Sequence, residues 1–116
     1  MIYKINMAKV ILKQLAEGDA NFNDVINYIE SKYNHIPAAF KNGNQENSAE
    51  QNQGSAKVLA FGELEQLSVE DTLKLFAEHY QSVLDTPEGT DHQNIRQFII
   101  NGWDGVKFES SALISK

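Results

Sequence analysis

Two histidines and an aspartate are the side chains in this sequence best suited to metal chemistry. His79 lies near the end of one predicted helix and His92 at the start of the next, so the turn between them could bring the two rings together beside Asp91. Neither a His-x3-His nor a His-Glu-x-x-His spacing occurs, and zinc sites use three or four ligands. His79 and His92 are therefore weak candidates for a metal site, and the alternative is two histidines bonded to their neighbours. We expect no metal and no cofactor.

A single arginine, Arg96, stands among nine lysines and lies four residues after His92. Its planar guanidinium suits a carboxylate or phosphate held by two parallel hydrogen bonds. One interpretation is a structural ion pair with Asp91, Glu88 or Asp85. The other is an anion contact at the mouth of a cleft. In an enzyme, Asp91, His92 and Arg96 would form an acid–base site.

Nucleophilic catalysis has little support in the sequence. No cysteine is present, which excludes thiolate nucleophiles, disulfides and cysteine metal sites. No Gly-x-Ser-x-Gly elbow and no glycine-rich phosphate loop occurs. We therefore predict no catalytic residue and favour a protein that is not an enzyme. The lone tryptophan, Trp103, either closes the core after the last helix or is an exposed recognition aromatic.

The charge balance excludes some partners and suggests another. Ten basic against sixteen acidic residues give a net charge of −6, which argues against a nucleic-acid surface. Eight of the acids lie between Gly62 and Asp91, where Lys74 is the only basic residue. This stretch is either a solvated face or a docking surface for a basic protein partner. No apolar run approaches the roughly 20 residues that span a bilayer, so we expect no membrane partner. The sequence does not indicate an oligomeric state.

Hydrophobic periodicity predicts the elements that must position these residues. With 116 residues the chain has the length of one domain. Five helical segments are expected, at 7–17, 22–36, 55–64, 69–84 and 91–101. Helix caps are predicted at Asn21, Ser68 and Thr90, and helix stops at Gly18 and Gly102.

The region between the second and third helices is rich in Asn and Gln. Residues 37–40 are predicted to be a short edge strand, and Asn42-Gly43 a turn. Residues 44–54 show no apolar period and predict a loop of about a dozen residues. A second short strand is expected at 106–108. The predicted fold class is mainly α (α+β at most), a compact single domain of about five helices with one or two short strands and a long Asn-rich loop. Residues 1–6 would be an N-terminal extension and 7–116 the domain.

Several short motifs resemble one known family. These are Phe40-Lys-Asn-Gly43, Asn52-Gln-Gly-Ser55, and the run Asp91-His-Gln-Asn-Ile-Arg96 followed by Gly102-Trp-Asp-Gly105. Together they resemble the HopJ type III effector family over about residues 22–113. The resemblance implies a small bacterial protein named as a secreted virulence effector. It brings no known reaction and no catalytic residues.

These observations favour a small binding module for an unknown protein partner. The candidate binding residues are Arg96, His92, Asp91, Trp103, Asn42 and Asn52. The alternatives are a bacterial housekeeping protein and a small enzyme or metal-binding protein. A first helix that begins by Met7 leaves at most six residues for a flexible export segment. We therefore expect the bacterial cytoplasm, with type III secretion into a host cell as the alternative.

Overall fold

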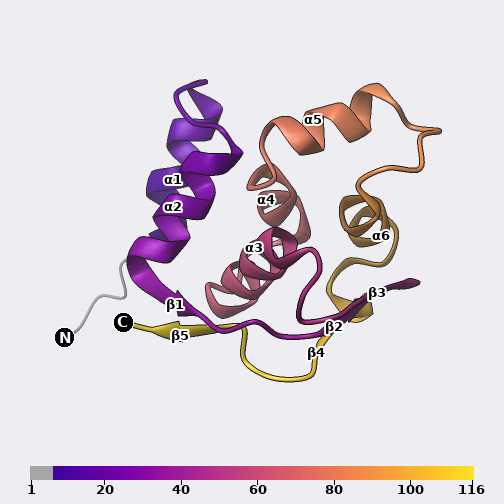
Figure 1. The fold of residues 1–116 in the computed structure, drawn as a ribbon. Helices are drawn as coiled ribbons and strands as arrows, with labels where there is room; N and C mark the ends of the chain where they lie inside the picture. The colour runs from indigo at the N-terminus through magenta and orange to yellow at the C-terminus, as the bar shows by residue number, and fades with distance from the viewer. Residues whose placement is uncertain (1–6) are drawn as a thin grey trace.

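The computed structural model describes residues 7–116, so the predicted extension at 1–6 lies outside the described residues. Within them the chain forms six α-helices and one 3-10 turn. The helices are α1 (Met7–Ala16), α2 (Phe22–Lys32), α3 (Gln53–Leu64), α4 (Val69–Lys74), α5 (Glu78–Asp85) and α6 (Gln93–Asn101), followed by the 3-10 turn Gly102–Gly105. In Figure 1, α1 and α2 stand at one end, α3 and α4 in the middle, and α5 and α6 at the other end.

Five three-residue strands run along the base of the helices (Figure 1). They are β1 (Tyr33–His35), β2 (Phe40–Asn42), β3 (Gln45–Asn47), β4 (Val106–Phe108) and β5 (Leu113–Ser115). β1 pairs with β5, and β2 lies between β3 and β4, all antiparallel. Phe40 is therefore opposite both Asn47 and Phe108, and its ring stacks on the Phe108 ring. The fold is mainly α with some β, as predicted.

Helix α3 occupies the centre of the core. Val58, Leu59 and Phe61 are fully buried, which is expected of a helix that is apolar on most of its circumference. The rings of Tyr28, in α2, and Tyr33, in β1, contact the Phe61 ring edge-on.

The capping predictions for α2 and α4 are confirmed. Asn21 accepts the backbone N–H of Asp24, whose carboxylate accepts the Asn21 N–H in return. The Ser68 hydroxyl accepts the backbone N–H of Asp71. Each bond satisfies a donor that the helix itself leaves unpaired. Gly18 has a positive φ directly after the end of α1, as a C-terminal stop requires.

The long helix predicted at 69–84 is wrong, because the chain breaks into α4 and α5. The break is at Ala77, whose φ of 53° and ψ of −124° leave the helical region. Leu75 and Phe76 are buried at the end of α4. The break lets α4 pack on the central α3 while α5 turns to pack on α6. A continuous helix would have carried α5 straight on.

The long Asn-rich loop is also wrong. Residues 40–47 form the β2–β3 hairpin, and only a short turn separates β3 from α3. The inward-facing residues of this hairpin include Asn42 and Asn47, which are buried through side-chain hydrogen bonds. The sequence of the β2–β3 hairpin therefore lacks the alternation of apolar and polar residues that is typical of strands. The second helix ends at Lys32, short of its predicted end, and β1 follows it directly. The edge strand predicted at 37–40 is wrong, because the strand formed there, β2, is the central strand of its sheet, between β3 and β4.

Candidate functional site

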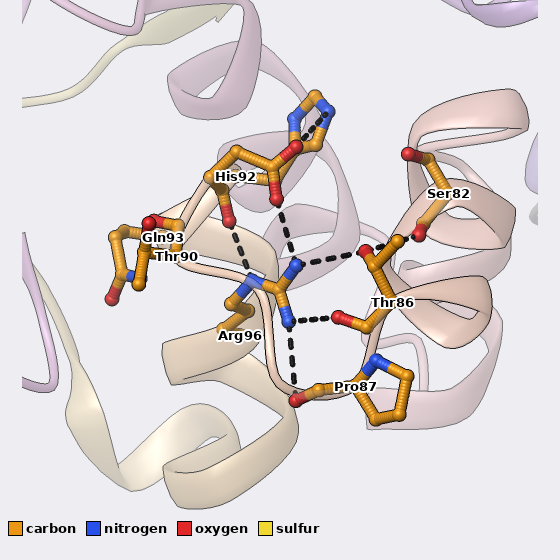
Figure 2. A network of polar contacts seen from close by, with 8 residues as sticks. Ser82, Thr86, Pro87, Thr90, His92, Gln93 and Arg96 are labelled. Atoms are coloured by element: carbon orange, nitrogen blue, oxygen red, sulfur yellow. Dashed lines mark hydrogen bonds and ion pairs between the residues drawn. The ribbon is translucent and has the colours of Figure 1, made fainter.

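The Arg96 guanidinium holds the turn between α5 and α6. Its Nε donates to the Asp91 carbonyl oxygen (2.6 Å) and its Nη2 to Asp91 Oδ1 (2.7 Å). Figure 2 shows Nη1 donating to the carbonyl oxygens of Thr86 (2.9 Å) and Pro87 (3.5 Å). Arg96 is 9% exposed, so its donors serve the oxygens of its own chain. The structural ion pair with Asp91 is the interpretation that this geometry matches.

Asp91 is the exposed partner of this clamp. Its hydrogen bond from Arg96 is the main cause that holds the Asp91 pKa below its usual value, with a smaller contribution from His92. The charged carboxylate therefore favours the closed turn. Arg96 and Asp91 act on the site next to them by fixing where His92 lies.

His92 begins α6 in an unusual backbone conformation. The capping box predicted at Thr90 is wrong, because the helix starts at Gln93 with His92 as the N-cap residue. His92 has φ 51° and ψ 49°, the left-handed region that histidine visits more readily than most residues. The Gln93 side chain does reach back, donating to the Thr90 carbonyl oxygen at 2.7 Å (Figure 2). The His92 side chain makes no cap hydrogen bond at the start of α6.

The left-handed turn places the His92 ring against the ring of His79. The two ring centroids are 5.1 Å apart, and the planes are tilted by 37°. His79 also meets the Phe22 ring edge-on at 4.7 Å, so three rings from α2, α5 and the start of α6 form one wall. His92 Nε2 lies 3.9 Å from Asp91 Oδ2. The turn brings the two histidines together, as their spacing suggested.

The start of α3 forms the facing wall. Its N-cap residue, Asn52, also has left-handed backbone angles, φ 53° and ψ 38°, and makes no cap bond with its side chain. Its amide Nδ2 instead donates to Asn47 Oδ1 at 2.7 Å. Gly54 and Ser55 follow in the first turn. The starts of α3 and α6 therefore share the same uncapped, left-handed geometry.

A cleft of about 460 Å³ lies between these walls. Its lining residues are Phe22, Gln45, Asn52, Gly54, Ser55, Phe76, His79, His92, Gln93, Asn94 and Ile95. None of these described residues carries a fixed charge, and the two histidines are its titratable groups. The first backbone N–H groups of a helix have no partner within it and lie at the positive end of the helix dipole. The cleft therefore offers N–H donors and imidazoles, a set suited to an acceptor-rich or anionic group.

A buried asparagine network supports the cleft from behind. Asn42 Nδ2 donates to the Asn94 carbonyl oxygen (2.7 Å), and Asn47 and Asn94 exchange hydrogen bonds between their amides (2.9 and 3.2 Å). Asn94 belongs to the first turn of α6, so the network ties the β2–β3 hairpin to the start of that helix. Among the described residues, Asn42 Oδ1 is the one buried side-chain polar atom that has no partner. Asn42 lies behind the cleft wall and is fully buried.

The predicted site residues separate into two groups. The structure brings His92 and Asn52 together in the cleft, with His79. Arg96, on α6, and Asp91, in the turn before it, do not line the cleft, and neither do Trp103 and Asn42. The Trp103 Nε1 donates to the Leu67 carbonyl oxygen (2.9 Å), and its ring meets Phe98 edge-on at 4.9 Å, so it packs against the core.

Sequence reasoning missed several residues of the cleft. Phe22 and Phe76 fit helical stripes and were expected only in the core. Gln45 and Gln93 were expected in a loop and a cap. Among the described residues, no group of three or more His, Asp or Glu side chains is placed to hold a metal ion. The part of the chain that is described also contains no helix with the length and apolarity to cross a bilayer.

Comparison with known proteins gives one family and one structure. A family model described as HopJ type III effector protein matches residues 8–113. A crystal structure of a protein of unknown function, VPA0580, is 43% identical in sequence, with a TM-score of 0.86. The alignment covers 100% of this chain and 97% of that one. No curated protein matches the chain.

Proposed function

The chain belongs to the HopJ type III effector protein family, and from this premise we propose that it is a small protein-binding module. The module recognises an anionic group of its partner, a carboxylate or a phosphate, in the cleft between the starts of α3 and α6. The observation that carries the proposal is the pair of imidazole rings of His79 and His92, 5.1 Å apart on the wall of that cleft.

The donors around the cleft explain the preference for an anion. Each neutral imidazole has one N–H, and each helix start adds backbone N–H groups that point out of the helix. No carboxylate lines the cleft among the described residues, and the Asp91 carboxylate, whose Oδ2 lies 3.9 Å from His92 Nε2, is paired with Arg96. A bound anion therefore meets no unpaired like charge in the lining. No lysine or arginine neutralises it either, which suits a modest, reversible interaction.

The size and shape of the cleft suit part of a peptide. A volume of about 460 Å³ falls in the range of small-molecule sites, roughly 300–1,000 Å³. The rings of Phe22 and Phe76 supply an apolar surface beside the polar donors. An acidic or phosphorylated side chain together with its neighbouring residues would use both kinds of contact.

Calorimetric titration with short peptides tests this function. The probes are three peptides of one sequence with glutamate, phosphoserine or serine at the central position. We expect the wild-type chain to bind one or both charged peptides. The His92→Asn variant should bind them at least fivefold more weakly, because asparagine also adopts the left-handed backbone conformation but lacks the imidazole ring. Lys107→Ala, an exposed change on β4, serves as the matched control. Equal binding of the serine peptide, or no effect of His92→Asn, would overturn the proposal.

The place of action is a separate part of the proposal. We place it in the bacterial cytoplasm, with delivery into a host cell as the alternative that the family name suggests. Ala8 and Ile11 are fully buried, so α1 belongs to the core and would have to unfold to serve as an export segment. Fractionation of strains with and without a working type III apparatus tests this placement. The placement would be contradicted if this protein appeared in the medium of the strain with a working apparatus and not in the medium of the strain without one.

A further inference from the structure

A second, apolar groove lies on the other side of the α4–α5 break from the cleft. It has a volume of about 670 Å³, and its apolar lining comes from α1 and α5 and the turns beside them. Its apolar lining residues include Leu12, Leu15, Ala16, Ala77, Tyr80 and Leu84. Leu84 is 51% exposed at the rim. In Figure 1, α1 and α5 lie on opposite sides of α4, and α5 extends away from α1.

The rim of the groove is acidic. Glu78 and Asp71 line it, with Asp71 paired with Lys74, and Asp85 directly follows Leu84. One Glu78 carboxylate oxygen accepts the Phe22 N–H at 2.8 Å. Lys74 is the basic residue of the lining, and it is engaged by Asp71 at 3.5 Å and by Glu70 at 3.9 Å. The groove therefore combines an apolar floor with a negative edge.

We propose that this groove binds an amphipathic helix of a partner protein whose polar face carries lysine or arginine. A groove formed by helices accepts a further helix that presents apolar residues at i, i+3, i+4 and i+7. Its basic residues would meet the acidic rim, and such complementarity selects the partner and speeds association. A second copy of this chain fits less well, because each copy carries a net charge of −6 and the same acidic rim.

Fluorescence anisotropy with synthetic helices tests the proposal on the full chain. The probe is an 18-residue peptide with leucine at i, i+3, i+4 and i+7 and lysine on its polar face. The control peptides replace lysine with glutamate, or scramble the sequence. We expect saturable binding of the basic helix that weakens as salt is added, because exposed charge contacts are screened. Absence of binding, or equal binding of the control peptides, would overturn the proposal.

Two matched variants locate the site. Leu84→Lys adds a positive charge at the groove, and Ile100→Lys makes the same kind of change on α6, where Ile100 is 72% exposed. We expect Leu84→Lys to weaken binding of the basic helix at least tenfold and Ile100→Lys to leave it unchanged. Equal effects of the two variants would contradict the placement. So would dimerisation of the wild-type chain that Leu84→Lys abolishes, since a second copy would then be the occupant.

The groove shares no lining residue with the cleft between α3 and α6. A chain that binds the basic helix but no anionic peptide would retain this inference and lose the proposed function. The reverse result would retain the proposed function alone.

Discussion

The imidazole rings of His79 and His92 lie 5.1 Å apart, although one belongs to α5 and the other begins α6. One side-chain feature and one backbone feature create this contact. Arg96 folds the connecting turn back onto α6, and the left-handed conformation of His92 turns its ring toward α5. The candidate site therefore depends on Arg96, which does not itself line it.

Arg96→Lys should destabilise the fold although it keeps the charge. Lysine cannot reproduce the fork that reaches Asp91 and Thr86 together, so carbonyl oxygens around the turn lose their donors. We expect a loss of about 2–4 kcal/mol in the free energy of unfolding. Urea denaturation measures it. Lys41→Arg, an exposed change on β2, is the control, and equal midpoints for the two variants would show that the clamp contributes little.

Asp91→Asn should make the stability less sensitive to acid. Because Arg96 lowers the pKa of Asp91 in the folded state, the charged carboxylate stabilises the fold above the pKa of the unfolded chain, about 4, and this contribution is lost as the pH falls through the lower folded value. Wild type should therefore lose more stability than Asp91→Asn between pH 7 and pH 3.

Urea midpoints at the two pH values check this prediction. Glu88→Gln, in the same exposed turn, removes one carboxylate without touching the bond to Arg96. Its acid sensitivity should stay close to that of wild type. A pH dependence of Asp91→Asn that matches wild type would contradict the assignment.

Asn47→Ala should be among the most damaging single changes in the chain. It removes a donor to Asn94 Oδ1 and the acceptor of the Asn94 and Asn52 amides, in a site where Asn47 is 3% exposed. Buried groups left without partners cost about 1–3 kcal/mol each, so we expect a total of about 2–4 kcal/mol. Asn44→Ala, exposed in the same hairpin, should stay within about 0.5 kcal/mol of wild type. Similar losses for both variants would argue against a structural network.

Ala77→Gly should stabilise the protein. Alanine at φ 53° and ψ −124° is in a region that glycine tolerates far better, and such strain costs about 1–3 kcal/mol. Part of the gain is offset by the greater freedom of glycine in the unfolded chain, which leaves up to about 1 kcal/mol. Thermal melting measures the change. Ala16→Gly, at the ordinary end of α1, should lower the melting temperature instead.

Local signals in the sequence explain which elements were predictable. Helix caps and stops depend on residues only a few positions apart, so they could be predicted directly from the sequence. Examples are the cap pairs Asn21 with Asp24 and Ser68 with Asp71, and the stop at Gly18. The break at Ala77 could not be predicted from local sequence, because alanine is a good helix former. Its strained backbone conformation is imposed by the burial of surfaces that are distant in the sequence.

The same distinction applies to the candidate site. The His79 and His92 pairing could be anticipated from a short turn between helices. The role of Asn52 was suggested only by its place in an Asn-rich segment. Asn42 was predicted to lie in a turn and Asn47 in a loop, since hydrogen bonds rather than apolar side chains hold these strand residues inward.

Histidine ring resonances give the most direct test of the central claim, that the cleft binds an anionic group. The measurement is a titration of the full chain with inorganic phosphate and separately with acetate, at constant pH and ionic strength, followed by NMR of the imidazole signals. The ring of His35 does not line the cleft and is the internal control. We expect the His79 and His92 signals to show saturable shifts with at least one of the two anions. The His35 signals should stay unchanged. Shifts of equal size at all three histidines, or none at His79 and His92 with either anion, would contradict it.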